Sequence, residues 1–582
     1  ASSKICVSGT NYKEYSFTLN SSETMQAQTF SITSAQEGTV CFGFTSLFPE
    51  DTFCKRTNGL RKDLAERVQA LNPAFLRYPG GCIVEGMNRE SIMHFHHTIG
   101  PIWERPSQYL LWGYRSTNGF GFDEFMQFCE DLNAVGLYVI NAGMSCQGRN
   151  PHYAEPAFVK KLAQETLDML EYALGGTETT WGKLRAQNGH SHQYPLKYLE
   201  IGNENFGKAY QKNYEAIYQI IKPVIEKYYP GVEIIANEHR EKCTLPCDII
   251  DEHYYSNREF FAMNADYYDN YPRNQQVYIG EYAVTRETTR GDLVSACGEA
   301  AFLIGAERNQ DVVKMTSYAP MFANEGHINW QPDLIRFSSG RNTVIPFYYV
   351  LEAFGQNRGE NVIGCDITTE DAEIERSNKI TLEGISADVR INDVVQKAES
   401  NGEYCGSDKD EYRIHILISE VNEHGRIGFC ANNHFNQDLD GYFLHYDEGH
   451  VQLIYWNGYS RMLLSEAIKC KLTANMNIQI DIRRDKFIVK LCGENLFCYN
   501  FKKMPKIVAS ATATQNEIMI KCVNTQSDEQ AIKLNFDTEI QEAVQYGYLT
   551  EYGFIWRTIK IENNFIYKMK PYEIAMIRAS KK

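Results

Sequence analysis

Residues 196–205 read LKYLEIGNEN, an apolar stretch of strand character that ends in Gly202, Asn203 and Glu204. Residues 276–284, QVYIGEYAV, have the same form, with Glu281 near the end of a second apolar stretch. In parallel barrels the catalytic side chains project from the carboxyl ends of the strands. The two glutamates are therefore candidates for chemistry that needs a pair of carboxylates.

The chain around these stretches alternates short apolar strands with long amphipathic helices from about residue 51 to residue 359. Strands are predicted at 74–80, 137–143, 196–204, 233–238, 247–255, 277–284 and 314–320, and helices at 122–136, 157–176, 209–229 and 293–309. Repeated β-then-α order implies a parallel sheet. Seven strands come close to an eight-stranded barrel, and no glycine-rich phosphate loop follows the first of them, as would be typical of an open doubly wound sheet.

The two ends of the chain read as β structure. Residues 1–48 contain alternating segments such as YSFTL and TVCFGFTSLF, and residues beyond 359 are short alternating strands separated by Asn, Asp and Gly turns. The densest run of strands, residues 379–502, is predicted to be a jelly roll inserted into a sandwich made by residues 360–378 and 503–582. The predicted fold class is therefore α/β plus all-β, with a barrel over residues 49–359.

Bulk composition excludes several classes of function. A net charge of −16 over 582 residues argues against nucleic acid as a partner, because binding to phosphates rests on clustered lysine and arginine. No apolar stretch is long enough to span a bilayer, so no membrane association is expected. Sixteen scattered cysteines favour reduced thiols and a cytoplasmic location, with secretion as the alternative if an upstream signal has been removed.

The residues beside the two glutamates strengthen the prediction of glycoside hydrolysis. Hydrolysis with retention needs one carboxylic acid to protonate the leaving oxygen and one carboxylate to attack the anomeric carbon. Asn203 offers an amide for a sugar hydroxyl near the reacting carbon, and His253 and Tyr255 lie on an intervening strand, where a phenol could orient the attacking carboxylate. No cofactor and no metal are expected, because the carboxylates supply the chemistry.

Longer motifs carry a family resemblance. Residues 45–86, EIGNE at 200–204 and GEYA at 280–283 resemble the α-L-arabinofuranosidases of glycoside hydrolase family 51, a family of retaining hydrolases. Further similar segments are TIGPIWERP at 98–106, NAGMSCQ at 141–147, NWQPDLI at 329–335 and PFYYVLEAFGQNRG at 346–359. The resemblance extends over residues 51–359, and a weaker similarity is present near the C-terminus.

The resemblance implies a (β/α)8 barrel and assigns roles to residues of this chain. Glu204 matches the acid/base and Glu281 the nucleophile, with Asn203 beside the acid/base and Tyr255 near the nucleophile. Arg77 matches an arginine that supports the nucleophile, and Cys82 matches a position that lines the sugar subsite. The acid is expected to stay protonated because partial burial and the neighbouring carboxylate raise its pKa.

The chain departs from the family pattern at its N-terminus. Members begin with a first barrel strand and loop that carry a sugar-binding glutamate, followed by a carbohydrate-binding-like sandwich. Residues 1–48 match only the later part of that sandwich, so the first barrel strand has no counterpart in this chain.

Four other features each have an ordinary structural explanation beside a functional one. The run His94, His96 and His97 has no metal-ligand spacing and is predicted to be a polar loop. Trp330 is a sugar-stacking platform or a core residue, and Glu85 either braces its loop or touches substrate. In the inserted unit, Tyr455, Trp456 and Tyr459 could bind polysaccharide, although a structural role is at least as well supported.

The sequence thus predicts an exo-acting hydrolase that releases terminal α-L-arabinofuranose from arabinan, arabinoxylan or arabino-oligosaccharides. The same mechanism on a β-xyloside or β-glucan is one alternative, because loops set the substrate on this fold. A non-catalytic carbohydrate-binding protein is the other. Homo-oligomerisation is left open.

Overall fold

The computed structural model describes residues 3–582 except 22, 24–28, 238–243, 287–289, 370, 373–375, 397–401, 408, 435–437, 459 and 562–565. Its centre is a seven-stranded sheet in the order β1-β4-β5-β6-β7-β8-β9, with each neighbouring pair parallel. The strands are β1 (Phe75–Tyr78), β4 (Val135–Ile140), β5 (Leu196–Ile201), β6 (Glu233–Ala236), β7 (Ile249–Ser256), β8 (Gln276–Val284) and β9 (Val313–Thr316). All seven predicted strands are confirmed.

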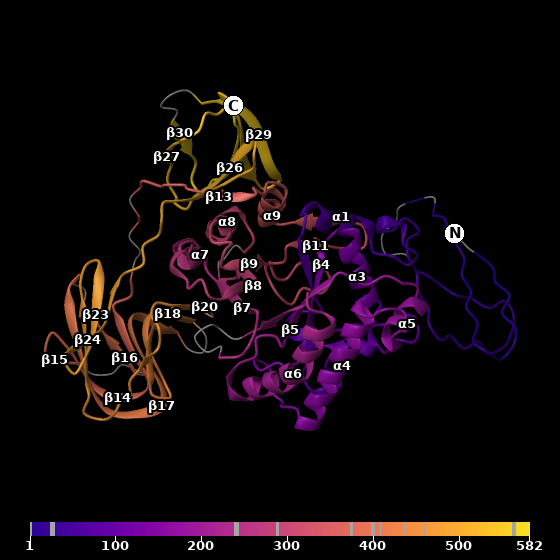
Figure 1. Cartoon of the computed structure of the whole chain (residues 1–582), viewed down its shortest axis with the longest axis horizontal. Coiled ribbons are helices and arrows are strands. Elements are labelled where there is room, and N and C mark those ends of the chain that lie inside the picture. Colours follow the sequence, from indigo (N-terminus) through magenta and orange to yellow (C-terminus); the bar gives the residue numbers. More distant parts are fainter. Residues whose placement is uncertain are drawn as a thin grey trace.

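Helices cover the outer face of this sheet (Figure 1). They are α1 (Lys62–Ala70), α3 (Phe122–Asp131), α4 (Pro156–Leu174), α5 (Thr180–Gln187), α6 (Gly207–Tyr228), α7 (Arg258–Met263), α8 (Leu293–Arg308) and α9 (Pro346–Gln356). The four helices predicted from the sequence are among them. Each of α3, α4 and α6 places its apolar residues on one face at helical spacing, which is the pattern that packs a helix against a sheet.

The sheet curls about an apolar interior. Side chains from alternate positions of several strands meet there, and the rings of Phe75 on β1 and Tyr278 on β8 lie 5.6 Å apart across it. Strands that are far apart in the sheet order therefore approach each other, as in a barrel. Among the described residues β1 and β9 are the edges of the sheet, so it forms a half-barrel.

Residues 1–48 do not confirm the predicted strands. The described residues of this segment form neither helix nor strand, and their large apolar side chains, such as those of Phe17, Phe42 and Leu47, are exposed. A strand is stable only when a neighbour satisfies its backbone groups, and no described segment pairs with this one. Alternating sequence alone is therefore not enough to make strands here.

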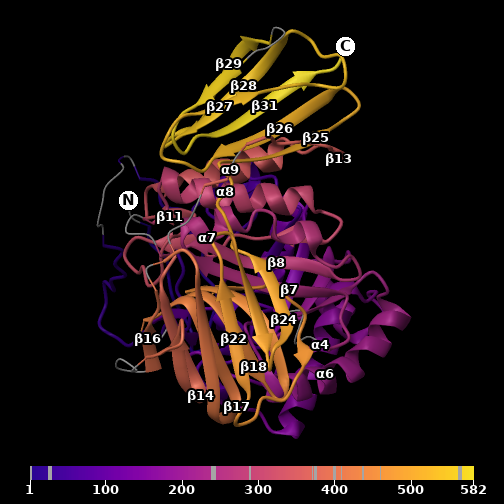
Figure 2. The same ribbon diagram turned by 90° about the vertical axis from the view of Figure 1, so that its left-hand side faces the viewer.

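The strands after α9 fall into two main sheets (Figures 1 and 2). An eleven-stranded sheet contains β14 (Lys379–Ile391), β15 (Val394–Val395), β16 (Glu403–Cys405), β17 (Tyr412–His434), β18 (Asp438–Asp447), β19 (His450–Gly458), β20 (Ser460–Leu463), β21 (Ile468–Lys469), β22 (Asn477–Ile482), β23 (Lys486–Leu491) and β24 (Glu494–Asn500). A six-stranded sheet contains β13 (Asn361–Ile363), β25 (Ile507–Ala513), β26 (Glu517–Asn524), β28 (Ala543–Thr550), β29 (Gly553–Lys560) and β31 (Ile574–Ser580).

Strand pairing thus separates the inserted residues from those on either side of them. Strand β13, which precedes the insertion, pairs with β25, which follows it. The jelly-roll topology and the exact domain limits stay predictions. The six-stranded sheet packs on α8 and α9 (Figure 2), where Lys521 forms a buried ion pair with Glu307.

Short elements complete the fold. They are α2 (Gly81–Glu85), β2 (Gln108–Leu110), β3 (Tyr114–Ser116), β10 (Phe322–Asn324), β11 (Ile335–Phe337), β12 (Asn342–Val344), β27 (Gln530–Lys533), β30 (Ile566–Met569) and the single 3-10 turns η1 (Phe53–Lys55), η2 (Arg89–Ser91), η3 (Phe95–His97) and η4 (Tyr267–Asn270).

Candidate active site

The two glutamates meet at the carboxyl ends of β5 and β8. One carboxylate oxygen of each, together with a ring nitrogen of His253, lies within 4.8 Å of the others. The side chain of Glu204 is 43% exposed, whereas that of Glu281 is 12% exposed. Carboxylate oxygens this close correspond to the short carboxylate separation of retaining hydrolases, in which one carboxylate attacks the sugar directly.

The turn after β5 places Glu204 in a left-handed backbone conformation, with φ of 50°. This conformation is costly for a residue other than glycine, and such strain often occurs at active sites. Gly202 also has positive φ, and a Cβ there would lie 2.5 Å from Oδ1 of Asn205. Oδ1 of Asn205 accepts a hydrogen bond from the backbone N–H of Asn203 at 3.1 Å, which closes the turn.

Arg77, at the carboxyl end of β1, joins the groups around the nucleophile candidate. Its guanidinium forms a bidentate pair with Glu200 at 2.8 and 2.9 Å and donates to Oε1 of Glu281 at 3.0 Å. It also donates to Oδ1 of Asn203 at 2.9 Å. A planar fork with several donors is suited to fixing carboxylates in one geometry. Arg77 therefore holds Glu281 and the amide next to Glu204 in fixed relative positions.

Two side chains of β7 contact the two glutamates. The phenol of Tyr255 donates to Oε2 of Glu281 at 2.5 Å. His253 lies 3.0 Å from Oε1 of Glu204 through Nδ1 and 2.7 Å from Oδ2 of Asp251 through Nε2. The parallel register of β7 and β8 places His253 beside Glu281.

The expectation that Glu204 stays protonated is wrong, because the charged groups around His253 change the pKa values of both residues. Burial alone would lower the pKa of His253, but the charges of Asp251 and Glu281 and its hydrogen bonds raise that pKa well above its ordinary value. Burial would likewise raise the pKa of Glu204, yet the hydrogen bond and positive charge of His253 outweigh it and lower the pKa. With no sugar bound, the proton therefore resides on His253, and Glu204 is ionised.

Glu85 braces the loop and does not face the pair of carboxylates. It is 1% exposed and accepts hydrogen bonds from the amides of Asn203 at 3.2 Å and Asn205 at 2.8 Å. Burial raises its pKa to about 9, so it is neutral at physiological pH. These contacts fit the bracing role considered for Glu85, and a contact with substrate stays a prediction.

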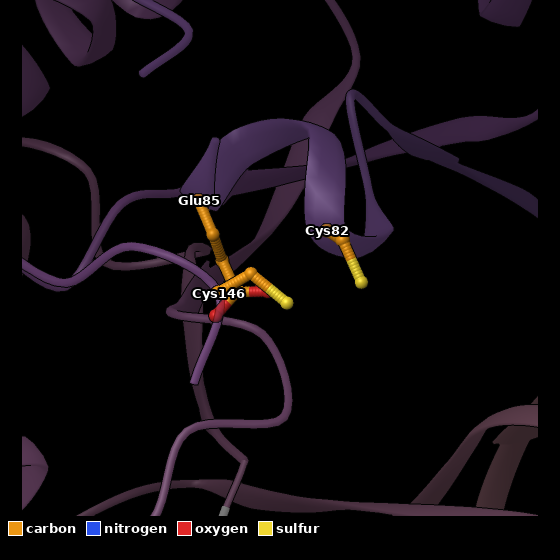
Figure 3. A group of neighbouring side chains, drawn as sticks. All are labelled: Cys82, Glu85 and Cys146. Atoms are coloured by element: carbon orange, nitrogen blue, oxygen red, sulfur yellow. The ribbon is translucent and has the colours of Figure 1, made fainter. Parts of the chain in front are cut away.

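Cys82 lies with Glu85 and Cys146 in a buried group whose donor atoms are within 4.8 Å of one another (Figure 3). Arg149 donates to the sulfurs of Cys82 at 3.1 Å and Cys146 at 3.2 Å. A hydrogen bond from Cys82 lowers the pKa of Cys146 to about 6, against the effect of burial and with the help of Arg149. The guanidinium already supplies positive charge to the sulfurs, and both oxygens of Glu85 are hydrogen-bonded, so the group is satisfied without a cation.

Trp330 is part of an aromatic group at the edge of the site. Its ring meets the ring of Tyr255 edge-on at 5.2 Å and that of Trp112 at 6.2 Å. Arg149 lies over Trp112 at 4.5 Å. A cavity of about 770 Å³ opens beside Trp330, with Thr285, Arg286, Arg290, Ile328, Asn329 and Gln331 among its described lining residues. Trp330 thus borders open space next to the nucleophile candidate.

The predicted residues come together with a few that were missed. Arg77, Asn203, Glu204, His253, Tyr255 and Glu281 form one set of direct contacts, with Trp330 and Cys82 at its margin. Sequence reasoning missed Glu200, Asp251 and Arg149. The signal for the first two was available, because each is an acidic residue that directly follows apolar residues of a predicted barrel strand.

The histidine run and the aromatic residues of the inserted unit lie elsewhere. His94 bonds to Glu165 at 2.8 Å and His96 to Asp168 at 3.2 Å, which fixes η3 on α4. Tyr455 is buried and Trp456 half-buried, whereas Tyr459 lies outside the described residues. A polysaccharide-binding role for them stays a prediction.

A curled parallel sheet with two carboxylates close together at its carboxyl end is the architecture of retaining barrel glycosidases. Two family profiles match the chain: the α-L-arabinofuranosidase 1 domain over residues 67–273 and the α-L-arabinofuranosidase C-terminal domain over residues 280–542. The chain belongs to the α-L-arabinofuranosidases of glycoside hydrolase family 51.

Relatives and solved structures agree with this assignment. The chain is 36% identical over 349 residues to an extracellular exo-α-L-arabinofuranosidase of Streptomyces chartreusis, covering 56% of this chain and 41% of that protein. It is 35% identical over 374 residues to α-L-arabinofuranosidase 2 of Arabidopsis thaliana, covering 63% and 54%. The chain thus spans about half the length of these relatives.

Among solved structures, the fold is similar to an arabinose-bound family 51 α-L-arabinofuranosidase, with a TM-score of 0.62 at 20% identity over 91% of this chain and 68% of that one. It is also similar to the Thermotoga maritima α-L-arabinofuranosidase in its arabinose complex, with a TM-score of 0.53 at 16% identity over 90% of each chain. In the described part of the chain, no helix is both long and apolar enough to cross a membrane.

Proposed function

We propose that this chain releases terminal α-L-arabinofuranosyl residues from arabinan, arabinoxylan or arabino-oligosaccharides, with retention of configuration at the anomeric carbon. The observation that carries the proposal is the separation of Glu204 and Glu281, whose carboxylate oxygens lie within 4.8 Å. The choice of sugar rests on family membership and on the names of the relatives.

In the first step, Glu281 attacks the anomeric carbon. Arg77 and Tyr255 each donate to one of its oxygens and hold the carboxylate toward the site. Glu204 protonates the leaving oxygen, and its greater exposure places it on the side from which the leaving group departs.

Protonation of Glu204 requires a proton from its neighbour. The carboxylate and the His253 ring lie 3.0 Å apart and share one proton, which resides on His253 when no sugar is bound. A bound sugar displaces water and thereby destabilises the ionised pair of His253 and Glu204. The form in which both groups are neutral is then favoured, so Glu204 carries the proton that it donates as the acid. Once the glycosyl-enzyme forms, Glu281 is neutral, and Glu204 acts as the base that activates water.

Variants of the two carboxylates test the roles. Glu281→Ala should abolish turnover of an aryl α-L-arabinofuranoside. Glu204→Ala should slow substrates with poor leaving groups by about 10²- to 10⁴-fold, the usual contribution of general acid catalysis, and slow 4-nitrophenyl substrates much less. Glu215→Gln, an exposed carboxylate on α6, serves as the matched control. A Glu281→Ala enzyme with near wild-type rate would refute the assignment.

Product stereochemistry and a substrate panel separate the alternatives. Proton NMR of the first-formed sugar should show the α-anomer, and an inverted product would contradict the short carboxylate separation. Hydrolysis of aryl β-xylosides or β-glucosides in place of the arabinofuranoside would assign the enzyme to those sugars instead. Saturable arabinan binding without released sugar would favour a binding protein.

A further inference from the structure

The tip of the inserted sheet reaches the strand that carries His253 and Tyr255. Strands β19 and β20 form an antiparallel pair in which Asn457 faces Ser460, and this pair packs on β7 (Figure 1). The hydroxyl of Ser460 accepts a hydrogen bond from the backbone N–H of Tyr255 at 2.7 Å and donates one to its carbonyl at 3.0 Å. Ser460 is 2% exposed, so solvent does not replace these bonds.

The backbone of Tyr255 needs this contact because β7 extends beyond its neighbour. Among the described residues, pairing between β6 and β7 ends at Ala236 and Ile250, whereas β7 continues to Ser256. Buried backbone groups without a partner are costly, and a hydroxyl can both donate and accept. The hydroxyl of Ser256 adds a bond at 3.1 Å to the carbonyl of Asn457, so two successive residues of β7 are attached to the inserted sheet.

Tyr255 also connects this contact to the reacting carboxylate. Its backbone is held by Ser460, and its phenol donates to Glu281 at 2.5 Å. Tyr255 is part-buried, with its ring packed against Trp330. A small displacement of the backbone at Tyr255 therefore moves the phenol relative to Glu281.

We propose that the β19–β20 tip is a positioning element, in which Ser460 and Asn457 fix β7 so that the phenol of Tyr255 stays on Glu281. This assigns to the inserted sheet a role in the reaction that does not require it to bind polysaccharide. The proposal rests on the proposed hydrolytic function. Ser460 acts only through Tyr255 and does not touch the substrate.

Ser460→Ala tests the proposal, with Ser465→Ala as the matched control. Ser465 lies just after β20 in the same inserted unit and makes the same kind of bonds, accepting from the N–H of Leu453 at 3.0 Å and donating to the carbonyl of Glu466 at 3.0 Å. Among the described residues, its hydroxyl bonds only within the inserted unit. Ser460→Ala should lower kcat on an aryl arabinofuranoside on the order of tenfold and leave KM within about twofold, because it disturbs orientation and not sugar binding. Ser465→Ala should leave both unchanged.

A double-mutant cycle separates positioning from general destabilisation. If Ser460 acts through the phenol of Tyr255, Ser460→Ala should have less than about a twofold effect on kcat in a Tyr255→Phe background. An equal loss in both backgrounds, or the same loss in Ser465→Ala, would overturn the proposal.

Hydrogen exchange supplies a readout that does not depend on turnover. Peptides that contain residues 249–256 should lose amide protection at Tyr255 in Ser460→Ala and keep it in Ser465→Ala. Unchanged protection would overturn the proposal even if kcat fell. Absence of arabinose release by the wild-type chain would instead refute the proposed function, and the exchange result would still decide whether the tip holds β7.

Discussion

Replacement of Asp251 by Asn should lower the pH at which activity is lost on the alkaline side. Asp251 is 3% exposed, and its Oδ2 lies 2.7 Å from Nε2 of His253, so it is a major cause of the raised pKa of that imidazole. Asn has nearly the same shape and keeps an oxygen that can accept the hydrogen bond. The variant therefore removes mainly the negative charge.

The size of the shift follows from the geometry. At an effective dielectric of about 20, a unit charge about 4 Å away contributes about 4 kcal/mol, and 1.36 kcal/mol corresponds to one pKa unit, so about three units is the upper bound. Because the hydrogen bond survives, we expect the alkaline limb of kcat/KM to move down by about one to three pH units.

The assay is kcat/KM against pH for an aryl α-L-arabinofuranoside with a poor leaving group, where protonation by Glu204 limits the rate. Glu252→Gln is the control, because Glu252 is an adjacent buried carboxylate that is held by the phenols of Tyr254, Tyr268 and Tyr271 and makes no bond to His253. An alkaline limb that stays in place or moves up in Asp251→Asn would refute the view that His253 supplies the proton.

Three further predictions follow from the same contacts. Burial raises the pKa of Glu85 from 4.5 to about 9, so between these values the folded chain keeps a proton that the unfolded chain has released, and stability falls as pH rises. Relative to wild type, Glu85→Gln should therefore gain about 1.4 kcal/mol in the free energy of unfolding per pH unit between pH 5 and 8. If urea unfolding gave the same difference in free energy between variant and wild type at both pH values, the result would contradict this prediction. Arg77→Lys should lower kcat at least about 100-fold, because one ammonium cannot replace a fork that contacts Glu200, Asn203 and Glu281, and a loss below about threefold in steady-state kinetics would count against that role. Trp330→Ala should lower kcat/KM on arabino-oligosaccharides about tenfold, whereas Trp181→Ala, which removes a ring stacked on His96, should not, and equal effects would argue against Trp330 as a sugar contact.

The barrel strands were predictable because their signal is local. They are short apolar runs, and several stand beside a helix of clear amphipathic pattern, as in residues 196–204 followed by 209–229. Residues 1–48 show the limit of this reasoning. Their alternation is as regular as that of a true strand, yet strand formation depends on a pairing partner that the local pattern does not reveal.

For the site, the sequence indicated which residues gather at the strand ends better than it indicated their charge state. Residue type and position at strand ends pointed to Glu204, Glu281 and Tyr255, but the expected protonation of Glu204 was wrong. The reason is that Asp251 and His253 reach it from another strand, and a pKa depends on every charge nearby.

The sequence by itself determined the order of the barrel strands and of four long helices, the positions of the two glutamates at strand ends and the family to which the chain belongs, because each of these depends on short contiguous segments. Only the tertiary structure decided that the carboxylates approach within 4.8 Å and that Arg77 and Tyr255 both donate hydrogen bonds to Glu281. It also decided that the tip of the inserted sheet forms hydrogen bonds with β7. These features join residues far apart in the chain, and their distances are set by the curl and register of the sheet, which no local pattern specifies.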